Sequence, residues 1–292
     1  MEIAVISGKG GTGKSSITAA ITNALGNVVL ADCDVDTANL HLLFNPEIEE
    51  EESFVGAETA VIDYGICINC GECMNYCRFD AISKDKNENI VISDIFCDGC
   101  GLCEKICPEK AISMLASTDS KLLSGNFRFG KMVLGHLAPG EENSGKLVNL
   151  VRDRAREISK TNNIEHIIID GPPGIGCPVI STVTGVDYCI IVTEPSLSGL
   201  HDLKRTIELV ESFKLNFGIL INKADLNDKI NVKITEFCNQ NNYNLLGQIN
   251  FDTNFVEAML NTKTIGEMFP ESESYGVVKH MVKKVLLSLS ES

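Results

Sequence analysis

The sequence predicts an α/β fold, in which a mostly parallel β-sheet is flanked by helices and interrupted by a small inserted α+β domain. Three observations lead to this prediction. Apolar, strand-like runs alternate with helix-like segments through most of the chain, which is typical of a parallel sheet. A glycine-rich segment at residues 8–15 follows the first apolar run directly. The composition changes abruptly at residues 58–117, where most of the cysteines gather, so this stretch is expected to form a separate unit.

Length, charge and cysteine content limit the possible function classes. A chain of 292 residues suits one large α/β domain or two domains. The net charge of −15 disfavours a nucleic-acid partner, because phosphate backbones require a basic surface. No apolar run is long enough to span a membrane, and no export signal is expected before the first strand. The twelve cysteines therefore indicate metal or redox chemistry in a reducing cytoplasm rather than disulfides.

The first element is a short buried strand over residues 1–7, which runs into a phosphate-binding loop. Residues 8–15 fit the pattern G-x-x-x-x-G-K-[ST], in which small residues let backbone N–H groups approach phosphates closely. Lys14 is expected to reach the β and γ phosphates, and Ser15 to place its hydroxyl on Mg²⁺. The helix predicted from Ser16 onward would point its N-terminus at the anion. The expected nucleotide contacts in this segment are Gly8, Lys9, Gly10, Gly11, Thr12, Gly13, Lys14, Ser15 and Ser16.

A second strand over residues 28–31 ends in Asp32 and Asp34. Carboxylates at the C-terminal end of a parallel strand lie on the ligand side of the sheet. A short helix over residues 37–44 follows and ends at Asn45-Pro46. The acidic run over residues 47–52 is expected to be a solvated connector.

The cysteine-rich segment is an internal repeat, since its two halves match at a spacing of 30 residues, from Cys67 to Cys97. Each half has the C-x₂-C-x₂-C-x₃-C spacing, which is that of bacterial two-cluster ferredoxins. In that pattern the fourth ligand of each [4Fe–4S] cluster comes from the other half. One cluster is therefore assigned to Cys67, Cys70, Cys73 and Cys107, and the second to Cys77, Cys97, Cys100 and Cys103. Zinc is the alternative metal, but zinc ribbons have two C-x₂-C pairs separated by a longer gap.

The chain after the insert continues the α/β alternation. Residues 127–137 are expected to form a strand pair around Gly130. The polar loop over residues 139–147 is open to contact with nucleotide, partner subunit or insert, or to a role as a plain connector. It leads into a helix over residues 147–159. The strand over residues 165–170 ends in Asp170, a Walker B pattern in which the carboxylate holds Mg²⁺ through water.

The last third of the chain supplies three more predicted strands, at residues 188–193, 217–222 and 245–249, with helices between and after them. The terminal helix over residues 275–289 is amphipathic. Its basic face carries only three lysines on a very acidic protein, so core packing is expected rather than membrane binding. Cys189 is expected in the core, together with Cys33 and Cys238.

The loop from Lys9 to Ser15 resembles the variant phosphate loop of the MinD/ParA family of P-loop ATPases, and the resemblance recurs outside residues 58–117. It implies that Lys9 reaches the partner's ATP across an ATP-dependent homodimer. It also implies that Asp34 orients the attacking water and that Asp32 supports the Mg²⁺ shell, with Ser15 and Asp170. Further family roles fall on Gly174, whose amide would sense the γ-phosphate, and on Asn222, which would read adenine. The implied catalytic residues are Lys9, Lys14 and Asp34.

Cys177 lies three residues after Gly174 and is open to three interpretations. It is favoured as a buried packing residue, and the alternatives are a functional single thiol or a ligand to a cluster bridging two subunits, as in related homodimers. Asn222-Lys-Ala-Asp225 is similar to the guanine-reading motif of GTPases, but the variant loop favours ATP.

The expected architecture is a P-loop ATPase domain over residues 1–57 and 118–292, with a ferredoxin-like insert over residues 58–117. Its cofactors would be ATP, Mg²⁺ and two [4Fe–4S] clusters. The hypothesis is a cytoplasmic ATPase, slow or partner-stimulated, that couples a nucleotide switch to electron transfer toward a protein redox partner or a metalloenzyme client. The alternative is a carrier or assembly factor for Fe–S or metal cofactors, with structural or sensory clusters.

Overall fold

The computed structural model describes residues 1–55, 58–94, 96–116, 119–138 and 144–290. The chain divides into two compact units. The larger comprises Met1–Glu51, Leu122–His136 and Gly145–Ser292, and the smaller comprises Glu52–Lys121 and Leu137–Ser144. The polar loop predicted at residues 139–147 lies, in its first five positions, outside the described residues.

The larger unit is built on a nine-stranded sheet with the order β13-β12-β11-β1-β10-β2-β9-β8-β3. Its strands are β1 (Glu2–Ser7), β2 (Val28–Asp32), β3 (Glu47–Phe54), β8 (Ser120–Phe127), β9 (Gly130–His136), β10 (His166–Pro173), β11 (Tyr188–Thr193), β12 (Phe217–Asn222) and β13 (Leu245–Ile249). The seven strands from β13 to β9 pair in parallel. The predicted α/β class with a mostly parallel sheet is thus confirmed.

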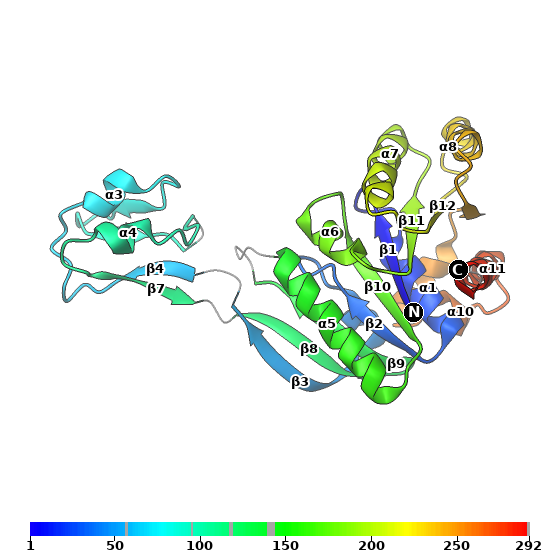
Figure 1. Cartoon of the computed structure of the whole chain (residues 1–292), viewed down its shortest axis with the longest axis horizontal. Helices are drawn as coiled ribbons and strands as arrows, with labels where there is room; N and C mark the ends of the chain where they lie inside the picture. Colours follow the sequence, from blue (N-terminus) through cyan, green and yellow to red (C-terminus); the bar gives the residue numbers. More distant parts are fainter. Residues whose placement is uncertain (56–57, 95, 117–118, 139–143, 291–292) are drawn as a thin grey trace. The chain divides into compact units, whose positions relative to one another are not determined.

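Helices cover both faces of this sheet (Figure 1). They are α1 (Lys14–Leu25), α2 (Leu40–Phe44), α5 (Ser144–Asn162), α6 (Cys177–Val183), α7 (Leu197–Ser212), α8 (Asp228–Gln240), α9 (Thr253–Leu260), α10 (Ile265–Met268) and α11 (Glu273–Ser290). Ile3 and Val5 of β1 pack in the core cluster that includes α1, α2 and α11, whereas Ile6 packs with α6, α7 and α8.

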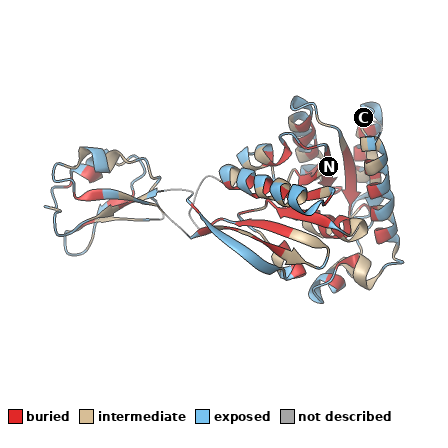
Figure 2. Ribbon diagram, turned by 60° about the horizontal axis from the view of Figure 1, so that its bottom comes forward, coloured by how far each residue is buried: buried red, intermediate tan, exposed pale blue. Residues whose placement is uncertain are grey.

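The central strands are nearly continuous apolar runs because helices bury them on both sides. Figure 2 shows these strands in red, with helices outside whose outer faces are exposed. β1, β2 and β11 have buried residues at almost every position. This rigid centre fixes the ends of the strands, where the polar side chains of the candidate site lie.

The acidic run at residues 47–52 is part of β3, so the prediction of a connector was wrong about its structure. Its side chains are exposed as expected, but the backbone forms the edge strand of the sheet. Neighbouring polar groups hold the strand in place: Lys131 pairs with Glu49 at 2.9 Å, and Ser124 donates to Glu50 at 3.2 Å. A glutamate-rich strand escapes prediction because charged residues are depleted in strands generally, although they are common at edges.

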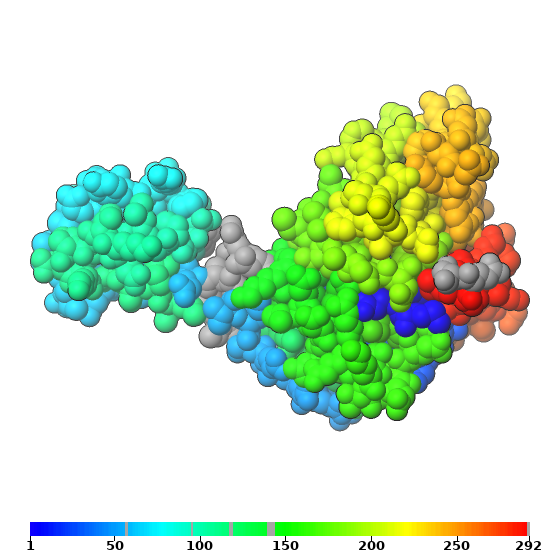
Figure 3. Space-filling view, viewed as in Figure 1, coloured from blue at the N-terminus to red at the C-terminus, as the bar shows by residue number. Residues whose placement is uncertain are grey.

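The terminal helix packs in the core, as predicted. α11 buries Val278, Met281 and Val285 in the cluster that contains α1 and the sheet. Its outer face forms part of the surface, red in Figure 3. Within the described residues, no helix combines the length and apolar character needed to cross a membrane.

The smaller unit has two short antiparallel sheets and two one-turn helices. Its elements are β4 (Glu58–Ile62), α3 (Glu72–Tyr76), β5 (Ile82–Lys84), β6 (Ile90–Ile92), α4 (Leu102–Ile106) and β7 (Ile112–Ala116). β4 pairs with β7, and β5 pairs with β6. Its small core contains Ile82, Ile90 and Ile112 together with cysteine side chains. The internal repeat of the sequence therefore appears as two repeated helix–strand segments, α3–β5 and α4–β7.

Candidate functional site

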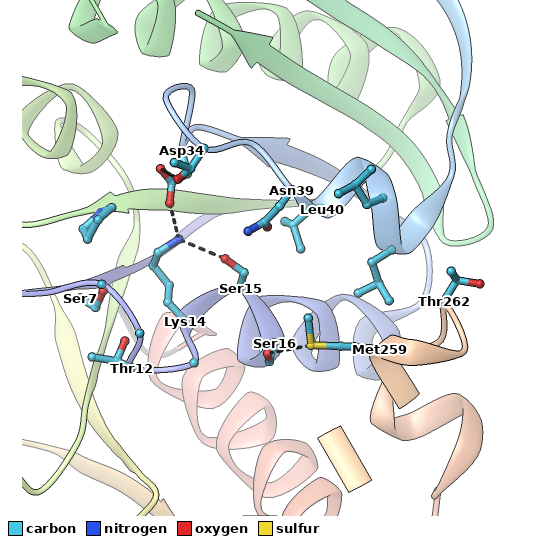
Figure 4. Close-up of a pocket in the computed structure, with 17 residues that line it drawn as sticks. Ser7, Thr12, Lys14, Ser15, Ser16, Asp34, Asn39, Leu40, Met259 and Thr262 are labelled. Atoms are coloured by element: carbon cyan, nitrogen blue, oxygen red, sulfur yellow. Dashed lines mark hydrogen bonds and ion pairs between the residues drawn. The ribbon is translucent and has the colours of Figure 1, made fainter. Parts of the chain in front are cut away.

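A cavity of about 520 Å³ opens beside the glycine-rich loop in the larger unit (Figure 4). It is lined by Ser7, residues 10–16, Asp34, Thr37, Asn39, Leu40, Leu42, Leu43, Pro173, Met259 and Thr262. One end is polar and is formed by the loop and Asp34. The other end is largely apolar and is formed by α2, α9 and the segment after α9. This division suits a ligand with a phosphate chain at one end and an apolar ring at the other.

The parallel sheet brings the predicted acidic residues together at the polar end. Asp32, the last residue of β2, is the register partner of Asp170 in β10. β10 continues beyond Asp170 to Pro173, so the predicted strand end at Asp170 was wrong by three residues. Lys14 lies 2.9 Å from Asp170 and 3.5 Å from Asp34, measured from Nζ to the nearest carboxylate oxygen. The Ser15 hydroxyl donates to Asp170 Oδ2 at 2.7 Å. One cluster at the polar end thus contains Lys14 and four other predicted site residues, Ser15, Asp32, Asp34 and Asp170.

Burial and the neighbouring charges together set the pKa values in this cluster. Burial alone would lower the pKa of Lys14, but the carboxylates of Asp170 and Asp34 outweigh it and raise that pKa, so the ammonium stays charged. Burial and the neighbouring Asp170 carboxylate raise the pKa of Asp32 to about 8. Asp32 also accepts hydrogen bonds from the backbone N–H groups of Asp34 and Leu40, at 3.2 and 3.3 Å. It therefore fixes the chain that follows β2.

Thr12 supplies an observation that fits a phosphate group. Its side chain is 2% exposed, lines the cavity, and its hydroxyl has no hydrogen-bond partner among the described residues. A buried hydroxyl without a partner is costly, because it loses its bonds to water without replacing them. A phosphate oxygen in the cavity would satisfy it.

The loop is held from behind by residues of β12 and the segment after it. The Asn222 amide donates to the Thr12 carbonyl at 2.8 Å, and Lys223 Nζ donates to the Gly11 carbonyl at 2.7 Å. Asn222 lies at the strand end as predicted, but in this structure its amide nitrogen contacts the loop backbone. Its predicted role as an adenine contact stays a prediction.

Lys9 does not line the cavity but pairs with Glu194 at 2.7 Å, and it also contacts Ser196 and Ser198 at 3.2 Å. Although burial acts to raise it, the pKa of Glu194 is lowered by Lys9 and by Lys223, which lies 3.1 Å away. The predicted reach of Lys9 into a partner's site stays a prediction. So does the predicted role of Gly174, whose N–H donates to the Ser7 carbonyl at 2.9 Å.

Sequence reasoning missed Thr18 and Glu194 in this region, and it named Lys223 only as part of a motif similar to the guanine-reading motif of GTPases. The Thr18 hydroxyl donates to Asp170 Oδ1 at 2.6 Å and so fixes the second oxygen of that carboxylate. One signal was available: Thr18 stands four residues after Lys14 in a helix, so both side chains lie on the same face. Nothing local in the sequence pairs Glu194 with Lys9 or Lys223.

The smaller unit contains two small cavities, each bordered by one of the predicted cysteine sets. Cys67, Cys70, Cys73 and Cys107 border one cavity. Cys77, Cys97, Cys100 and Cys103 border the other. Every one of these thiols is free of a disulfide. Among the described residues, no three Cys, His, Asp or Glu side chains converge closely enough for a single metal ion.

Backbone groups support both cysteine sets. The N–H of Ala60 points at Cys97 Sγ at 3.5 Å, and the N–H of Ala111 points at Cys107 Sγ at 3.3 Å. Gly71 and Gly101 directly precede α3 and α4 and have φ of 80° and 68°, the left-handed conformation that glycine adopts most easily. Four thiols around a cavity, with N–H groups aimed at sulfur, fit an iron–sulfur cluster.

Cys177 is exposed, so the interpretation as a buried packing residue was wrong. It is the first residue of α6, which starts at the surface just after the segment that follows β10. Cys33, Cys189 and Cys238 are fully buried, as predicted. Burial raises the pKa of all three thiols, so they are protonated core residues.

Comparisons with known proteins agree with this geometry. A profile of the CobQ/CobB/MinD/ParA nucleotide binding domain matches residues 3–265. An uncharacterized protein of Methanocaldococcus jannaschii, MJ0578, is 38% identical over 231 residues, which cover 78% of this chain and 80% of the relative. A ferredoxin of Pyrobaculum islandicum is 38% identical over 76 residues, or 25% of this chain and 71% of the ferredoxin.

The fold is similar to that of the septum site-determining protein MinD of Pyrococcus horikoshii, solved in complex with Mg-ADP. The TM-score is 0.57 at 19% identity, and the alignment covers 97% of this chain and 95% of that one. At this identity the likeness concerns the fold.

Proposed function

The chain belongs to the CobQ/CobB/MinD/ParA nucleotide-binding family, and we propose that it is an ATP-hydrolysing iron–sulfur protein that couples a nucleotide switch to electron transfer. The observation that carries the proposal is the presence, in one chain, of a phosphate-loop cavity and of two cavities each bordered by four thiols. In this proposal the ATPase unit comprises residues 1–57 and 118–292, and the ferredoxin-like insert comprises residues 58–117.

The nucleotide half of the proposal assigns a role to each polar group. Lys14, charged and fixed by Asp170, binds the β and γ phosphates of ATP. Ser15 and Asp170 hold Mg²⁺, with Asp32 behind them. The Asp34 carboxylate, 3.5 Å from Lys14, orients water for attack on the γ-phosphorus, which yields ADP and phosphate.

Lys9 completes the site of a partner subunit in this proposal. A cation supplied from outside the site is worth about 10³–10⁵ in rate in related phosphoryl transfers. Its present partners, Glu194 and two serine hydroxyls, would have to be exchanged for phosphate oxygens on dimerisation. Slow hydrolysis by a monomer follows from this arrangement.

The redox half rests on the thiols of the insert. Two [4Fe–4S] clusters, when bound, supply one-electron carriers whose potentials span about −700 to +450 mV across proteins. Cys67, Cys70, Cys73 and Cys107 would hold one, and Cys77, Cys97, Cys100 and Cys103 the other. The N–H groups of Ala60 and Ala111 stabilise thiolate charge at their sulfur partners.

The sheet supports a mechanical link between the two functions. The chain leaves the ATPase sheet after β3 and returns in β8, and these strands are neighbours. β8 leads through a two-residue turn into β9, which pairs with β2, the strand that ends at Asp32. A displacement of the segment after Asp32 on nucleotide exchange would therefore act on strands connected directly to the insert.

An anaerobic EPR redox titration tests the proposal, performed once with ADP and once with a non-hydrolysable ATP analogue. We expect the midpoint potential of at least one cluster to differ between the two nucleotides, and the nucleotide affinity to depend on cluster oxidation state by the same factor. Identical potentials and an unchanged affinity would contradict coupling and would favour a carrier or assembly factor. Absence of ATP hydrolysis by the purified protein, with and without reductant, would contradict the ATPase assignment.

A further inference from the structure

Arg128 lies in the two-residue turn between β8 and β9, and every donor of its guanidinium group is used. Nε and Nη2 donate to the two carboxylate oxygens of Glu267 at 2.7 and 3.0 Å. Nη2 also donates to the Thr262 carbonyl at 2.9 Å. Nη1 donates to the carbonyls of Leu43 and Phe44 at 3.2 and 3.1 Å. An arginine side chain has five N–H donors, so none is left over.

Aromatic packing holds the guanidinium in this position. It lies 5.0 Å from the centroid of the Phe44 ring and 5.6 Å from that of Phe129. Phe44, Phe127 and Phe129 contact one another edge to face, with centroids 5.0 to 6.1 Å apart. Cation–π contacts of this kind restrict the orientation of the planar group.

Glu267 is fixed as firmly as Arg128. It is the third residue of α10 and forms a capping box with Thr264, in which its side chain accepts from the Thr264 N–H at 2.7 Å. Burial acts to raise the pKa of Glu267, but hydrogen bonds from Arg128 and Thr264 outweigh it and lower that pKa. The pair therefore joins the β8–β9 turn rigidly to α10.

The segments joined by Arg128 are the two walls of the apolar end of the nucleotide cavity. Leu43, with Leu40 and Leu42, forms the α2 wall, and Thr262, with Met259, forms the wall from α9 and the segment after it. Figure 4 shows Leu40 and Thr262 on different segments around the cavity, with Met259 near Ser16 of the loop helix. Arg128 is absent from the lining residues and binds both walls from outside through their backbone carbonyls.

We propose that Arg128 is a positioning residue that sets the separation of these walls and thereby the affinity for the nucleoside part of the nucleotide. This rests on the proposed function, since it takes the cavity as the ATP site. The phosphate end is built from the glycine-rich loop, β2 and β10, none of which Arg128 contacts through a hydrogen bond or ion pair. The effect should therefore depend on whether the ligand carries a base and ribose.

The test is ligand binding by Arg128→Lys, measured by calorimetry with Mg·ATP and with Mg·tripolyphosphate as separate probes. Lysine keeps the charge but has three donors on one nitrogen and cannot bridge both walls and Glu267. We expect the affinity for ATP to be about tenfold weaker, which corresponds to the net free energy of one to two lost hydrogen bonds. The affinity for tripolyphosphate should stay within twofold of the wild-type value. In steady-state hydrolysis, KM should rise while kcat stays within twofold.

Arg154→Lys is the matched control, because Arg154 is also a partly exposed arginine paired with a glutamate, Glu50, at 2.7 Å. It should leave both affinities and the KM unchanged. If Arg128→Lys does not fold, as judged by circular dichroism, Glu267→Gln replaces it. That variant keeps an acceptor for Thr264 but loses the charged pair, and a weaker affinity for ATP alone is again expected.

Unchanged ATP affinity in a folded variant would overturn the inference. Equal weakening of ATP and tripolyphosphate would also overturn it, because the effect would then be a general loss of structure. A wild-type protein that binds neither ligand would instead contradict the proposed function, so the two failures can be told apart.

Discussion

Single residues fix the conformation of the phosphate loop, and Gly13 is the tightest case. It has φ of 87°, and a Cβ built on it would lie 2.3 Å from the Asn222 amide nitrogen. That amide holds the loop through Thr12. A side chain at Gly13 would therefore carry backbone strain and would also displace the group that supports the loop from behind.

Gly13→Ala is expected to abolish measurable ATP binding while the protein remains folded. The left-handed conformation alone costs an alanine about 1–2 kcal/mol, and the contact with Asn222 adds to it. Calorimetric titration with Mg·ATP measures the loss. The control is Gly185→Ala, at a glycine with φ of 74° and no atom within 4 Å of the added Cβ. It should lower stability slightly but bind ATP normally, and normal binding by Gly13→Ala would count against the loop as the phosphate site.

Residues with local signals could be predicted, and residues whose partners are distant could not. The loop motif identified Lys14 and Ser15, and strand ends identified Asp32 and Asp170, because each signal lies within a few positions in the sequence. Arg128 has partners in α2 and in the segments around α10. No periodicity connects them, so only the folded chain reveals its role.

At the scale of elements, the buried strands were predictable and the edge was not. β1, β10 and β11 are apolar runs buried on both faces, which is a strong signal. β3 is acidic, and its strand conformation depends on pairing with the rest of the sheet and on polar contacts with neighbouring residues. Its sequence alone therefore predicted a connector. The prediction that Cys177 is buried was wrong for a similar reason, because exposure depends on how the chain folds around the residue. Cys177 is the first residue of α6, which begins at the surface.

The repeated cysteine elements give a prediction of their own. Cys70→Ser is expected to remove one of the two proposed clusters, because Cys70 borders only one of the two cavities. The iron content should fall by about half, and ATP binding should persist. Iron analysis and EPR after anaerobic reconstitution measure this. Cys177→Ser, at an exposed cysteine outside both cavities, is the control and should keep all its iron. Loss of ATP binding together with the cluster would argue against independent elements.

At the scale of the whole molecule, the two units have separate cores and separate sites. Lys14→Ala is expected to eliminate ATP hydrolysis, since it removes the only lysine paired with both Asp34 and Asp170 among the described residues. The two proposed clusters should remain, as judged by iron content and visible absorbance. Loss of iron from this variant would show that the units are not independent.

The acidic edge of the large sheet also affects how copies of the chain meet. An edge strand exposes a row of backbone donors and acceptors, and two such edges on different molecules tend to pair and start aggregation. β3 presents mainly glutamate side chains along this edge. Two copies approaching edge to edge would bring like charges together, which opposes strand pairing. The glutamates of β3 are therefore expected to disfavour the extension of the sheet from one copy of the chain to the next at this edge.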